Sequence, residues 1–469
     1  MLAKTVGEGW LKRERLLPLL ALVVIQVVLL FDVSFHDPRI GYDAASHLKY
    51  AAVLAHGRLP NPSDTYEFFS PPLPYTVAAL ANAAGFELQG LAGKAGQFAN
   101  LFYSIAVCIF ILKICNLLSP GSYQLQFWSL ALLAFIPAYY KSFSMVRGEP
   151  LLCLFAMASV YYAMRAYDLA SRRRWDFVIL GVLLGLAVLC RQWGFFIFPA
   201  LALYAVMLPA PNLLARMLNL RPLVLSFAIA AIVGGWFYVG LHQRFGKVTA
   251  FNEAAPQWSL ANEPARFYFG LGLDSVFTDP IRSRFANEFS PTFYSEFWGD
   301  YECYFVVYAT SPESGDYISG LELVHRLRRD RFADFFYTNR FTIAPWLGLA
   351  QAGAIVPSML FFAGFLMAMT ALIGRGLATC ADGLLALVIL TSMIGFLWFL
   401  IGFPAGNGNT IKATYMLQII PLVAILGARM LLILRDRSPG LYKIFLGLLP
   451  LSAILLAPFL FTRYVTIPW

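Results

Sequence analysis

Three side chains capable of proton chemistry recur at helical spacing near the N-terminus. Asp43, His47 and Tyr50 stand at positions i, i+4 and i+7, so a helix would carry them on one face. At an outer membrane surface, that face would present a carboxylate, an imidazole and a phenol. The carboxylate could act as a general base toward a hydroxyl acceptor, and a partly apolar setting would raise its pKa toward the useful range. Asp43 could equally well cap the N-terminus of the helix.

A second stretch has the composition of a sugar-binding site. Residues 298–302, Trp-Gly-Asp-Tyr-Glu, combine a glycine with aromatic rings and carboxylates, and Asp300 is the candidate contact. Packing within a folded loop accounts for the same residues and is the simpler interpretation. Residues 66–75 contain three prolines, which hold the chain extended and predict a turn. The sequence has no Gly-rich nucleotide cradle, so a nucleotide-sugar donor is not indicated.

The composition places these residues in a membrane protein. Of 469 residues, 59% are hydrophobic and 13% are charged, and the mean hydropathy is +0.66. Soluble domains average about 25% charged residues. The net charge of +9 comes largely from short loops between apolar runs, such as Arg172–Arg174 and Arg435–Lys443. Such loops mark the cytoplasmic side, so we expect a lipid bilayer as partner and no nucleic acid. Five of the six cysteines lie in or beside apolar runs, so no disulfide framework is indicated.

Eleven apolar segments predict an all-α polytopic protein, because a span needs about 20 apolar residues. The predicted spans are 14–33, 98–118, 124–140, 150–168, 177–190, 192–210, 222–241, 348–374, 383–402, 413–434 and 444–462. The first lacks a small-residue cleavage site and predicts a retained helix. With a cytoplasmic N-terminus, the odd number of spans leaves the C-terminus, including Trp469, outside.

Two outer segments are too long to be simple connections. In 34–97 we expect two helices lying in the interface plane, at about Asp43–Ala55 and Tyr75–Ala84. The segment 242–347 is rich in aromatic residues, which disordered chains lack, so it should be folded. The predicted regions are therefore 1–33, 34–97, 98–241, 242–347 and 348–469: the first helix, the first outer loop, spans two to seven, the second outer loop and the last four spans.

Short stretches of the sequence resemble one enzyme family. The first outer loop is similar to that of GT-C glycosyltransferases, in the bacterial branch that depends on phospholipid carriers and is related to protein mannosyltransferases and aminoarabinose transferases. The resemblance covers most of the chain as a pattern of spans but only short stretches as residues. These are Asp43 with His47 and Tyr50, Gly57-Arg58-Leu59-Pro60, Pro71-Pro72-Leu73, Arg147-Gly148-Glu149-Pro150, Leu189-Cys190-Arg191-Gln192 and Ile411–Leu417.

The resemblance implies a GT-C fold in the bacterial inner membrane and an enzyme working on its outer face. Such an enzyme transfers a sugar from a polyprenyl-phosphate donor to a glycan, lipid or protein acceptor, and we expect a direct displacement that inverts the anomeric configuration. Its catalytic base corresponds to Asp43. Many relatives carry two adjacent acidic residues here, whereas Ala44 follows Asp43. A divalent metal is therefore not supported by an acidic pair, and no cofactor is expected.

The same resemblance gives the outer cations a role. A departing polyprenyl phosphate needs positive charge near its leaving oxygen, and Arg191, Lys412 and Arg147 are the candidates for binding the donor phosphate. Each could instead extend toward lipid headgroups. The candidate substrate contacts are His47, Tyr50, Glu149, Tyr415 and Asp300; for Glu149 we favour pairing with one of the arginines.

Two other functions fit the same spans. A lipid or sugar transporter, or a flippase, would bind near the midplane, often through repeats and broken helices. The sequence has no internal repeat, and its polar residues concentrate in two outer loops, which favours surface chemistry. A glycan ligase or polymerase using a lipid-linked oligosaccharide would keep the chemistry and change the donor, and the fold alone does not separate it from a monosaccharide transferase.

Overall fold

The structure is a computed structural model. It describes residues 2–168, 173–208, 211–249, 256–273, 275–278, 280, 287–299, 308–310, 317–319, 343–374, 381–405, 408 and 410–462.

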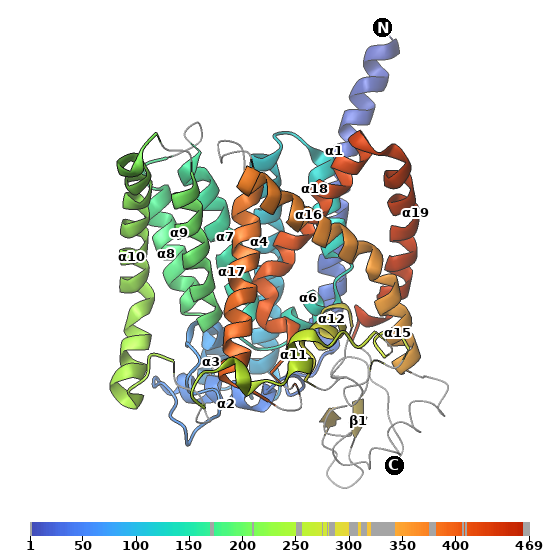
Figure 1. The fold of residues 1–469 in the computed structure, drawn as a ribbon. Helices are drawn as coiled ribbons and strands as arrows, with labels where there is room; N and C mark the ends of the chain where they lie inside the picture. Colours follow the sequence, from blue (N-terminus) through green and yellow to red (C-terminus); the bar gives the residue numbers. More distant parts are fainter. Residues whose placement is uncertain are drawn as a thin grey trace.

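Long helices running in alternate directions form the bundle (Figure 1). Helices suit this setting because lipid offers no hydrogen bonds to the backbone. The helices of the bundle are α1 (Leu2–Phe35), α4 (Leu91–Leu118), α5 (Tyr123–Leu133), α6 (Pro137–Phe143), α7 (Glu149–Tyr167), α8 (Asp176–Val188), α9 (Ile197–Met207), α10 (Leu213–Phe245), α15 (Ile343–Gly353), α16 (Ile355–Gly374), α17 (Ala381–Gly402), α18 (Ile420–Arg437) and α19 (Pro439–Leu456).

Within the described residues, each predicted span is mostly helical. Among the described residues, seven helical stretches are long and apolar enough to cross a membrane: 14–35, 91–118, 217–245, 346–373, 381–402, 413–437 and 439–459. The chain is thus a multi-pass membrane protein, and the count of eleven spans stays a prediction.

Several predicted spans are not one continuous α-helix. The range 124–140 divides into α5 and α6, because Pro137 cannot continue α5 and instead begins α6. The range 348–374 is interrupted between α15 and α16. Two further spans begin with 3-10 helices, η2 (Gln192–Phe196) before α9 and η4 (Ala413–Ile419) before α18.

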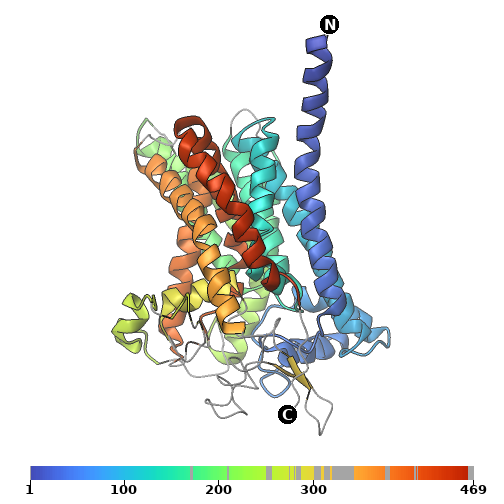
Figure 2. The ribbon, with the colours of Figure 1, turned by 90° about the vertical axis from the view of Figure 1, so that its right-hand side faces the viewer.

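The first outer loop has the two predicted helices. They are α2 (Ala44–Ala55) and α3 (Thr76–Ala83), with the 3-10 turn η1 (Leu73–Tyr75) leading into α3. Both lie at one end of the bundle, opposite the projecting end of α1 (Figures 1 and 2). They pack against each other, and α3 packs on α4. This packing fixes α2 over the ends of the bundle helices.

The described parts of the second outer loop are folded as well. They comprise the 3-10 helix η3 (Leu260–Asn262), α11 (Ala265–Phe269), α12 (Phe289–Trp298) and a small antiparallel pair, β1 (Tyr308–Thr310) and β2 (Tyr317–Ser319), with Tyr308 opposite Ser319. This pair is an exception to the all-α prediction. Because α12 packs against α6, η4 and α15, it brings the loop to the same end of the bundle as α2.

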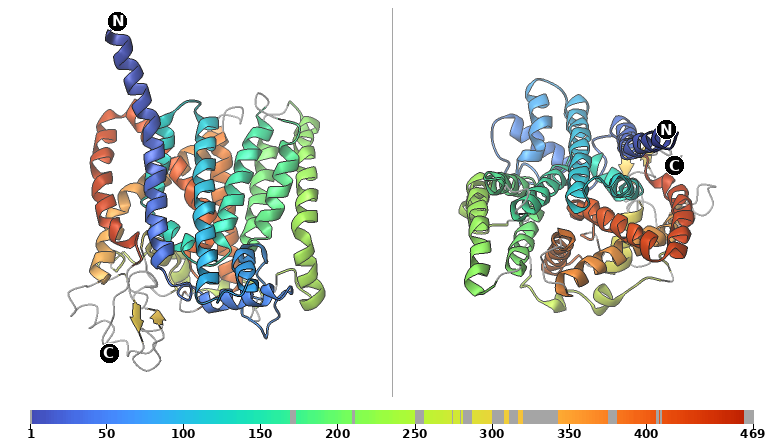
Figure 3. Two further views of the ribbon diagram at one scale, coloured as in Figure 1. Left: turned by 180° about the vertical axis from the view of Figure 1, so that it is seen from behind. Right: turned by 90° about the horizontal axis from the view of Figure 1, so that it is seen from above.

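The bundle therefore has two distinct faces. We call the end with α2, α3, α11 and α12 the site face and the opposite end the N-terminal face (Figure 3). The C-terminal end of α1 lies at the site face, where the Thr462 backbone N–H donates to Asp32 at 2.7 Å. Residue 462 thus lies across the bundle from the start of α1. The predicted outer placement of Trp469 falls outside the described residues.

Candidate functional site

Asp43 immediately precedes α2, and its side chain does not cap the helix. Its backbone is left-handed, with φ 55° and ψ 25°, and its side chain makes no cap hydrogen bond. Aspartate is one of the few residues that tolerate this conformation. The backbone carbonyl of Asp43 instead accepts from the N–H groups of Ser46 and His47, which leaves the carboxylate available. The geometry therefore excludes the capping role that the sequence left open for this side chain.

Lys412 faces the carboxylate of Asp43. Lys412 Nζ lies 3.4 Å from Asp43 Oδ2, and it also lies over the rings of Tyr42 and Tyr415, 4.7 and 5.5 Å from their centroids. The Lys412 side chain is 13% exposed, whereas that of Asp43 is 50% exposed. Lys412 therefore points into the site and does not extend toward lipid headgroups. The structure brings together the predicted base and one predicted phosphate ligand from distant parts of the chain.

This lysine reverses the expected pKa shift of Asp43. The charge on Lys412 lowers the pKa of Asp43 to about 2, against the opposing effect of burial. The expectation of a raised pKa was wrong, since it considered the apolar setting and not a cation from η4. Asp43 is ionised throughout the physiological range.

Arg147 lies over the same two rings as Lys412. Its guanidinium carbon is 5.5 Å from the Tyr42 centroid and 5.6 Å from that of Tyr415. Arg147 Nε and Nη2 donate to the two oxygens of Glu149, at 2.6 and 3.0 Å. The pairing favoured for Glu149 is thus present. Arg147 Nη1 is buried and has no partner among the described residues, so one donor of this guanidinium remains available to a ligand.

Arg191 joins three segments of the chain. It is buried, and its Nε donates to Glu149 at 2.9 Å while its Nη1 donates to Glu67 at 2.8 Å and also to Ser70. These contacts connect the end of α8 to the start of α7 and to the first outer loop. Two carboxylates already neutralise Arg191, so its role as a phosphate ligand stays a prediction.

Gly148 makes this connection possible. A Cβ at position 148 would lie 2.5 Å from both Arg191 Cγ and the Cys190 carbonyl oxygen. Glycine at this position therefore lets the backbone before α7 approach Arg191 closely enough for Glu149 to accept its hydrogen bond.

His47 and Tyr50 face the interior, not the surface. His47 Nδ1 is 2.8 Å from the hydroxyl of Tyr75, and Tyr50 stacks on the same ring at 4.2 Å. Both side chains are buried. Burial, as the largest effect, lowers the pKa of His47 to about 4, so the imidazole is neutral at pH 7. The expected row of three exposed groups is wrong because Asp43 precedes the helix and the inner face of α2 packs on α3.

The sequence did not identify several residues that complete the site. Glu67 and Ser70 belong to a segment that predicted only a turn; Glu67 lies 3.9 Å from His47. Burial alone would raise the pKa of Glu67, but the charge of His47, present once the imidazole is protonated at low pH, and the charge of Arg191 hold it below its ordinary value. The position of Glu67 between Tyr66 and Phe68 was the available signal, since a charge in such an apolar stretch needs a partner.

Glu296 ties the second outer loop to the residue before Asp43. It comes from α12, is fully buried, and accepts hydrogen bonds from the Tyr42 hydroxyl and from Lys141 Nζ, the latter at 3.0 Å. Lys141 also lies over the Tyr42 ring, 5.5 Å from its centroid. Tyr42 therefore has cations around its ring and a carboxylate at its hydroxyl. These contacts fix the backbone that carries Asp43, and sequence spacing alone could not pair Glu296 with Tyr42.

Further polar groups lie beside Tyr415 without a partner among the described residues. Trp193 stacks obliquely on Tyr415, with 5.3 Å between ring centroids, and its Nε1 is buried and unpaired. The hydroxyl of Thr414, the neighbour of Tyr415, is also buried and unpaired. Buried polar groups normally have partners, so these donors, with Arg147 Nη1, are available for a bound ligand.

The remaining predictions about the site are not resolved by the described residues. Asp300 lies outside them; its neighbour Trp298 is buried and stacks on Phe361, 5.7 Å between centroids, which is a packing role. Within the described part of the chain, no group of three His, Cys, Asp or Glu side chains could hold a metal ion. Metal dependence stays a prediction.

Comparisons with known proteins identify the fold. No protein-family model and no curated protein matches the chain. The apo oligosaccharyltransferase of Archaeoglobus fulgidus matches 95% of this chain with a TM-score of 0.52 and 13% identity, over 56% of its own length. The complex of that enzyme with Zn and sulfate matches 94% of this chain with a TM-score of 0.51 and 11% identity, over 53% of its length. ArnT from Cupriavidus metallidurans, bound to undecaprenyl phosphate, gives a TM-score of 0.48 and 16% identity, over 96% of this chain and 65% of its own.

The likeness to the oligosaccharyltransferase confirms the expected GT-C-like fold. This chain spans about half the length of that enzyme, and the identity is low. The comparison therefore establishes the arrangement of helices, and the chemistry has to be argued from the residues of this chain.

Proposed function

We propose that this protein is an integral membrane glycosyltransferase that moves a sugar from a polyprenyl-phosphate donor to an acceptor hydroxyl at the site face. The observation that carries the proposal is the half-exposed carboxylate of Asp43, 3.4 Å from Lys412, with Arg147 behind it. A base thus lies beside cations suited to a phosphate leaving group. The fold supports the proposal because structures with the same arrangement of helices include an oligosaccharyltransferase.

In the proposed reaction, Asp43 accepts the proton of the acceptor hydroxyl. The hydroxyl oxygen forms a bond to the anomeric carbon as the bond from that carbon to the phosphate oxygen breaks, which inverts the anomeric configuration. The bonding electrons leave with the polyprenyl phosphate. Lys412 and Arg147 stabilise the negative charge that develops on the leaving oxygen.

The Asp43–Lys412 contact also gives donor binding a role in preparing the base. With Lys412 at 3.4 Å, the pKa of Asp43 is about 2, which makes it a weak proton acceptor. A donor phosphate would compete with Asp43 for the ammonium of Lys412. As the ammonium turns to the phosphate, the pKa of Asp43 would rise and its strength as a base would increase.

Arg191, Glu67 and Glu149 hold the site together in this scheme. Their mutual contacts fix the helix ends from which Arg147 projects. The unpaired donors of Trp193 and Thr414 lie where they could bind hydroxyls of the donor sugar. His47 and Tyr50 support the first outer loop from inside.

The decisive experiment measures release of carrier phosphate. Purified protein would be incubated with polyprenyl-phosphate monosaccharides and with lipid-linked oligosaccharides, in the presence of candidate acceptors. Asp43→Asn should reduce transfer by about 100-fold or more, the usual contribution of a general base, with only a small fall in the thermal unfolding temperature, because a half-exposed ion pair contributes little stability. Asparagine accepts the left-handed backbone of Asp43, so the fold should tolerate it.

Asp64→Asn is the matched control. Asp64 lies in the same loop and also pairs with a cation, Arg58, at 2.7 Å, and its side-chain hydrogen bonds within the described residues go to Arg58 and Asn61, not to Lys412 or Arg147. This variant should keep wild-type turnover. Equal losses in both variants, or wild-type turnover in Asp43→Asn, would contradict the assignment of the base. Movement of an intact donor across the membrane without release of phosphate would favour the transporter.

A further inference from the structure

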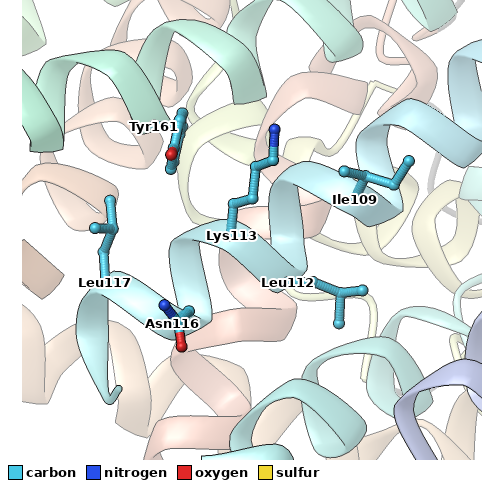
Figure 4. A pocket seen from close by; sticks show the side chains of 6 residues that line it. All are labelled: Ile109, Leu112, Lys113, Asn116, Leu117 and Tyr161. Atoms are coloured by element: carbon cyan, nitrogen blue, oxygen red, sulfur yellow. The ribbon is translucent and has the colours of Figure 1, made fainter. Parts of the chain in front are cut away.

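A groove between α4 and α7 is separate from the site. It has a volume of about 300 Å³ and is lined by Ile109, Leu112, Lys113, Asn116, Leu117 and Tyr161; we call it the α4–α7 groove (Figure 4). It lies toward the N-terminal face, because α4 ends at Leu118 and α7 runs from Glu149, at the site, to Tyr167. Nothing in the proposed reaction uses it.

The ammonium of Lys113 lies near two aromatic rings. Its Nζ lies 5.1 Å from the centroid of Phe110 and 5.5 Å from that of Tyr161. A lysine that only extends toward water near a helix end would follow the helix. Lys113 instead reaches across from α4 to a ring of α7, as Figure 4 shows. Lys113 is an exposed residue whose ammonium lies near both rings, within reach of a ligand in the groove.

The charge of Lys113 is not neutralised within the described part of the chain. No described carboxylate forms an ion pair with it. The nearby Arg165 provides the contrast, since it also lies over the Tyr161 ring, at 5.6 Å, but pairs with Asp176 at 3.1 Å. The groove thus carries one net positive charge, together with the polar side chains of Asn116 and Tyr161.

The surroundings of the charge are apolar and face the membrane. Leu91–Leu118 is one of the stretches able to span a bilayer, and Ile109, one turn before Lys113, is 41% exposed. Lys113 stands five residues before the end of α4, or about 7.5 Å at the helical rise. This depth corresponds to the region where lipid phosphates meet the acyl chains.

We infer that the α4–α7 groove binds the phosphate of an anionic glycerophospholipid from the leaflet at the N-terminal face. Lys113 would bind the phosphate, Asn116 and the Tyr161 hydroxyl would supply neutral hydrogen bonds, and Ile109 and Leu112 would contact an acyl chain. Basic pockets between spanning helices bind such headgroups. The charge and the membrane-facing wall together favour a lipid over a soluble anion.

Such a lipid would stabilise the packing of α4 against α7, the two helices that position the segment leading to Arg147. At the other end of α4, Gln97 and Asn100 donate to the backbone carbonyls of Ser144, Phe143 and Met145, at 2.7, 3.0 and 2.8 Å. That segment leads directly to Arg147, and α7 begins at Glu149. A lipid that connects α4 to α7 would therefore raise the thermal stability of the protein in detergent.

The test measures lipid retention and thermal unfolding of the full-length protein. Purified protein in a neutral detergent would receive phosphatidylglycerol, phosphatidylcholine or glycerol phosphate, with bound lipid counted by native mass spectrometry. Phosphatidylglycerol should be retained and should raise the unfolding temperature more than the other two. Lys113→Gln should reduce its retention about fivefold, the change expected for one basic residue at a membrane surface.

Two variants distinguish this site from general attraction to the membrane. Lys443→Gln removes one exposed lysine of α19 at the same face and should leave retention unchanged. Tyr161→Leu removes the ring next to Lys113 and should reduce retention as Lys113→Gln does. Equal retention by Lys113→Gln and wild type, or equal losses in Lys113→Gln and Lys443→Gln, would overturn the inference. Equal stabilisation by glycerol phosphate would show a soluble-anion site instead.

Discussion

Asp43 combines a backbone constraint with an unusual charge environment. Its left-handed conformation limits the residues that fit at this position, and its ion pair with Lys412 keeps it ionised to low pH. The folded pKa of about 2 lies below the value of about 3.9 for an unperturbed aspartate. The pair therefore contributes stability above about pH 4, and this contribution is lost as the pH falls through about 2.

The pH dependence of the reaction should depend on Lys412. Because kcat/KM reports the free enzyme, the wild-type profile should have no acidic limb from Asp43 above about pH 3. In Lys412→Met the main cause of the lowered pKa is removed, so an acidic limb should appear near pH 4, the ordinary range of an aspartate. Steady-state kinetics measured from about pH 3 to about pH 8, a range that includes the ordinary pKa of an aspartate, test this prediction. Identical acidic limbs in the two proteins would mean that Lys412 does not control the charge of Asp43.

Glu296 should be essential for the stability of the site although it does not touch the substrate. Glu296→Gln replaces a buried carboxylate, in contact with Lys141 and Tyr42, by a neutral amide. Breaking a buried ion pair costs about 3–5 kcal/mol, so thermal unfolding should shift clearly downward and transfer should fall.

Glu87→Gln supplies the control for that prediction, since Glu87 is exposed in the first outer loop and its substitution should change neither property. A Lys141→Met/Glu296→Gln double variant should recover part of the lost stability. Independent, additive losses would show that the two side chains are not coupled.

At the residue scale, the sequence indicated candidate residues but not their contacts. Asp43 was proposed from its spacing and resemblance in the first outer loop and Lys412 from its place at a predicted span end, and the structure brings the two side chains together. Glu67 and Glu296 could not be paired with Arg191 and Tyr42, because those contacts join segments 124 and 254 residues apart. No local periodicity carries such information.

The packing of the start of α7 against the end of α8 depends on the close contact between Gly148 and Arg191. Gly148→Ala would place a Cβ 2.5 Å from Arg191 Cγ and the Cys190 carbonyl oxygen, so the start of α7 and the end of α8 would have to separate. Overpacking of this kind costs about 1–3 kcal/mol. We expect a lower unfolding temperature and a marked loss of transfer.

Gly235→Ala is the matched control for this element. Gly235 lies inside α10, and a Cβ there meets nothing within 4 Å. Alanine should stabilise the helix by about 0.5–1 kcal/mol relative to glycine. Differential scanning fluorimetry of the two variants in one detergent compares them directly. A Gly148→Ala protein with wild-type stability would indicate that α7 and α8 can move apart freely.

Hydropathy located the helices but not their interruptions. Each predicted span is mostly helical where the structure describes it, because a bilayer demands long apolar stretches with satisfied backbone groups. The 3-10 helices η2 and η4 were not predicted, since the mean hydropathy of a sequence window does not distinguish one helical geometry from another. These are the segments that follow Arg191 and Lys412, so the irregular geometry coincides with the site.

At the scale of the whole molecule, the distribution of basic residues predicts how the protein is oriented in the membrane. Basic loops at the N-terminal face predict a cytoplasmic location for that face and an outer location for the site. In a background with Cys303 and Cys380 replaced by serine, the four remaining cysteines are buried. Single cysteines at Lys49, exposed on α2, and at Arg437, exposed at the end of α18, then report the two faces.

A membrane-impermeant thiol reagent applied to intact cells should label Lys49→Cys and not Arg437→Cys. After permeabilisation both should be labelled, which shows that each thiol is reactive. The reverse pattern would invert the predicted orientation and place the site inside the cell.

The contacts of Arg191 also impose an order on biogenesis. Glu67 is synthesised 124 residues before Arg191, a delay of roughly 6 to 25 s at translation rates of about 5–20 residues per second. Until Arg191 has been synthesised and α8 has packed into the bundle, Glu67 lacks the cation that stabilises it when buried, and it should remain in water. The first outer loop would then dock only after the arginine is in place, so the proposed activity would be acquired late, and any defect in placing α8 would leave that loop accessible to proteases.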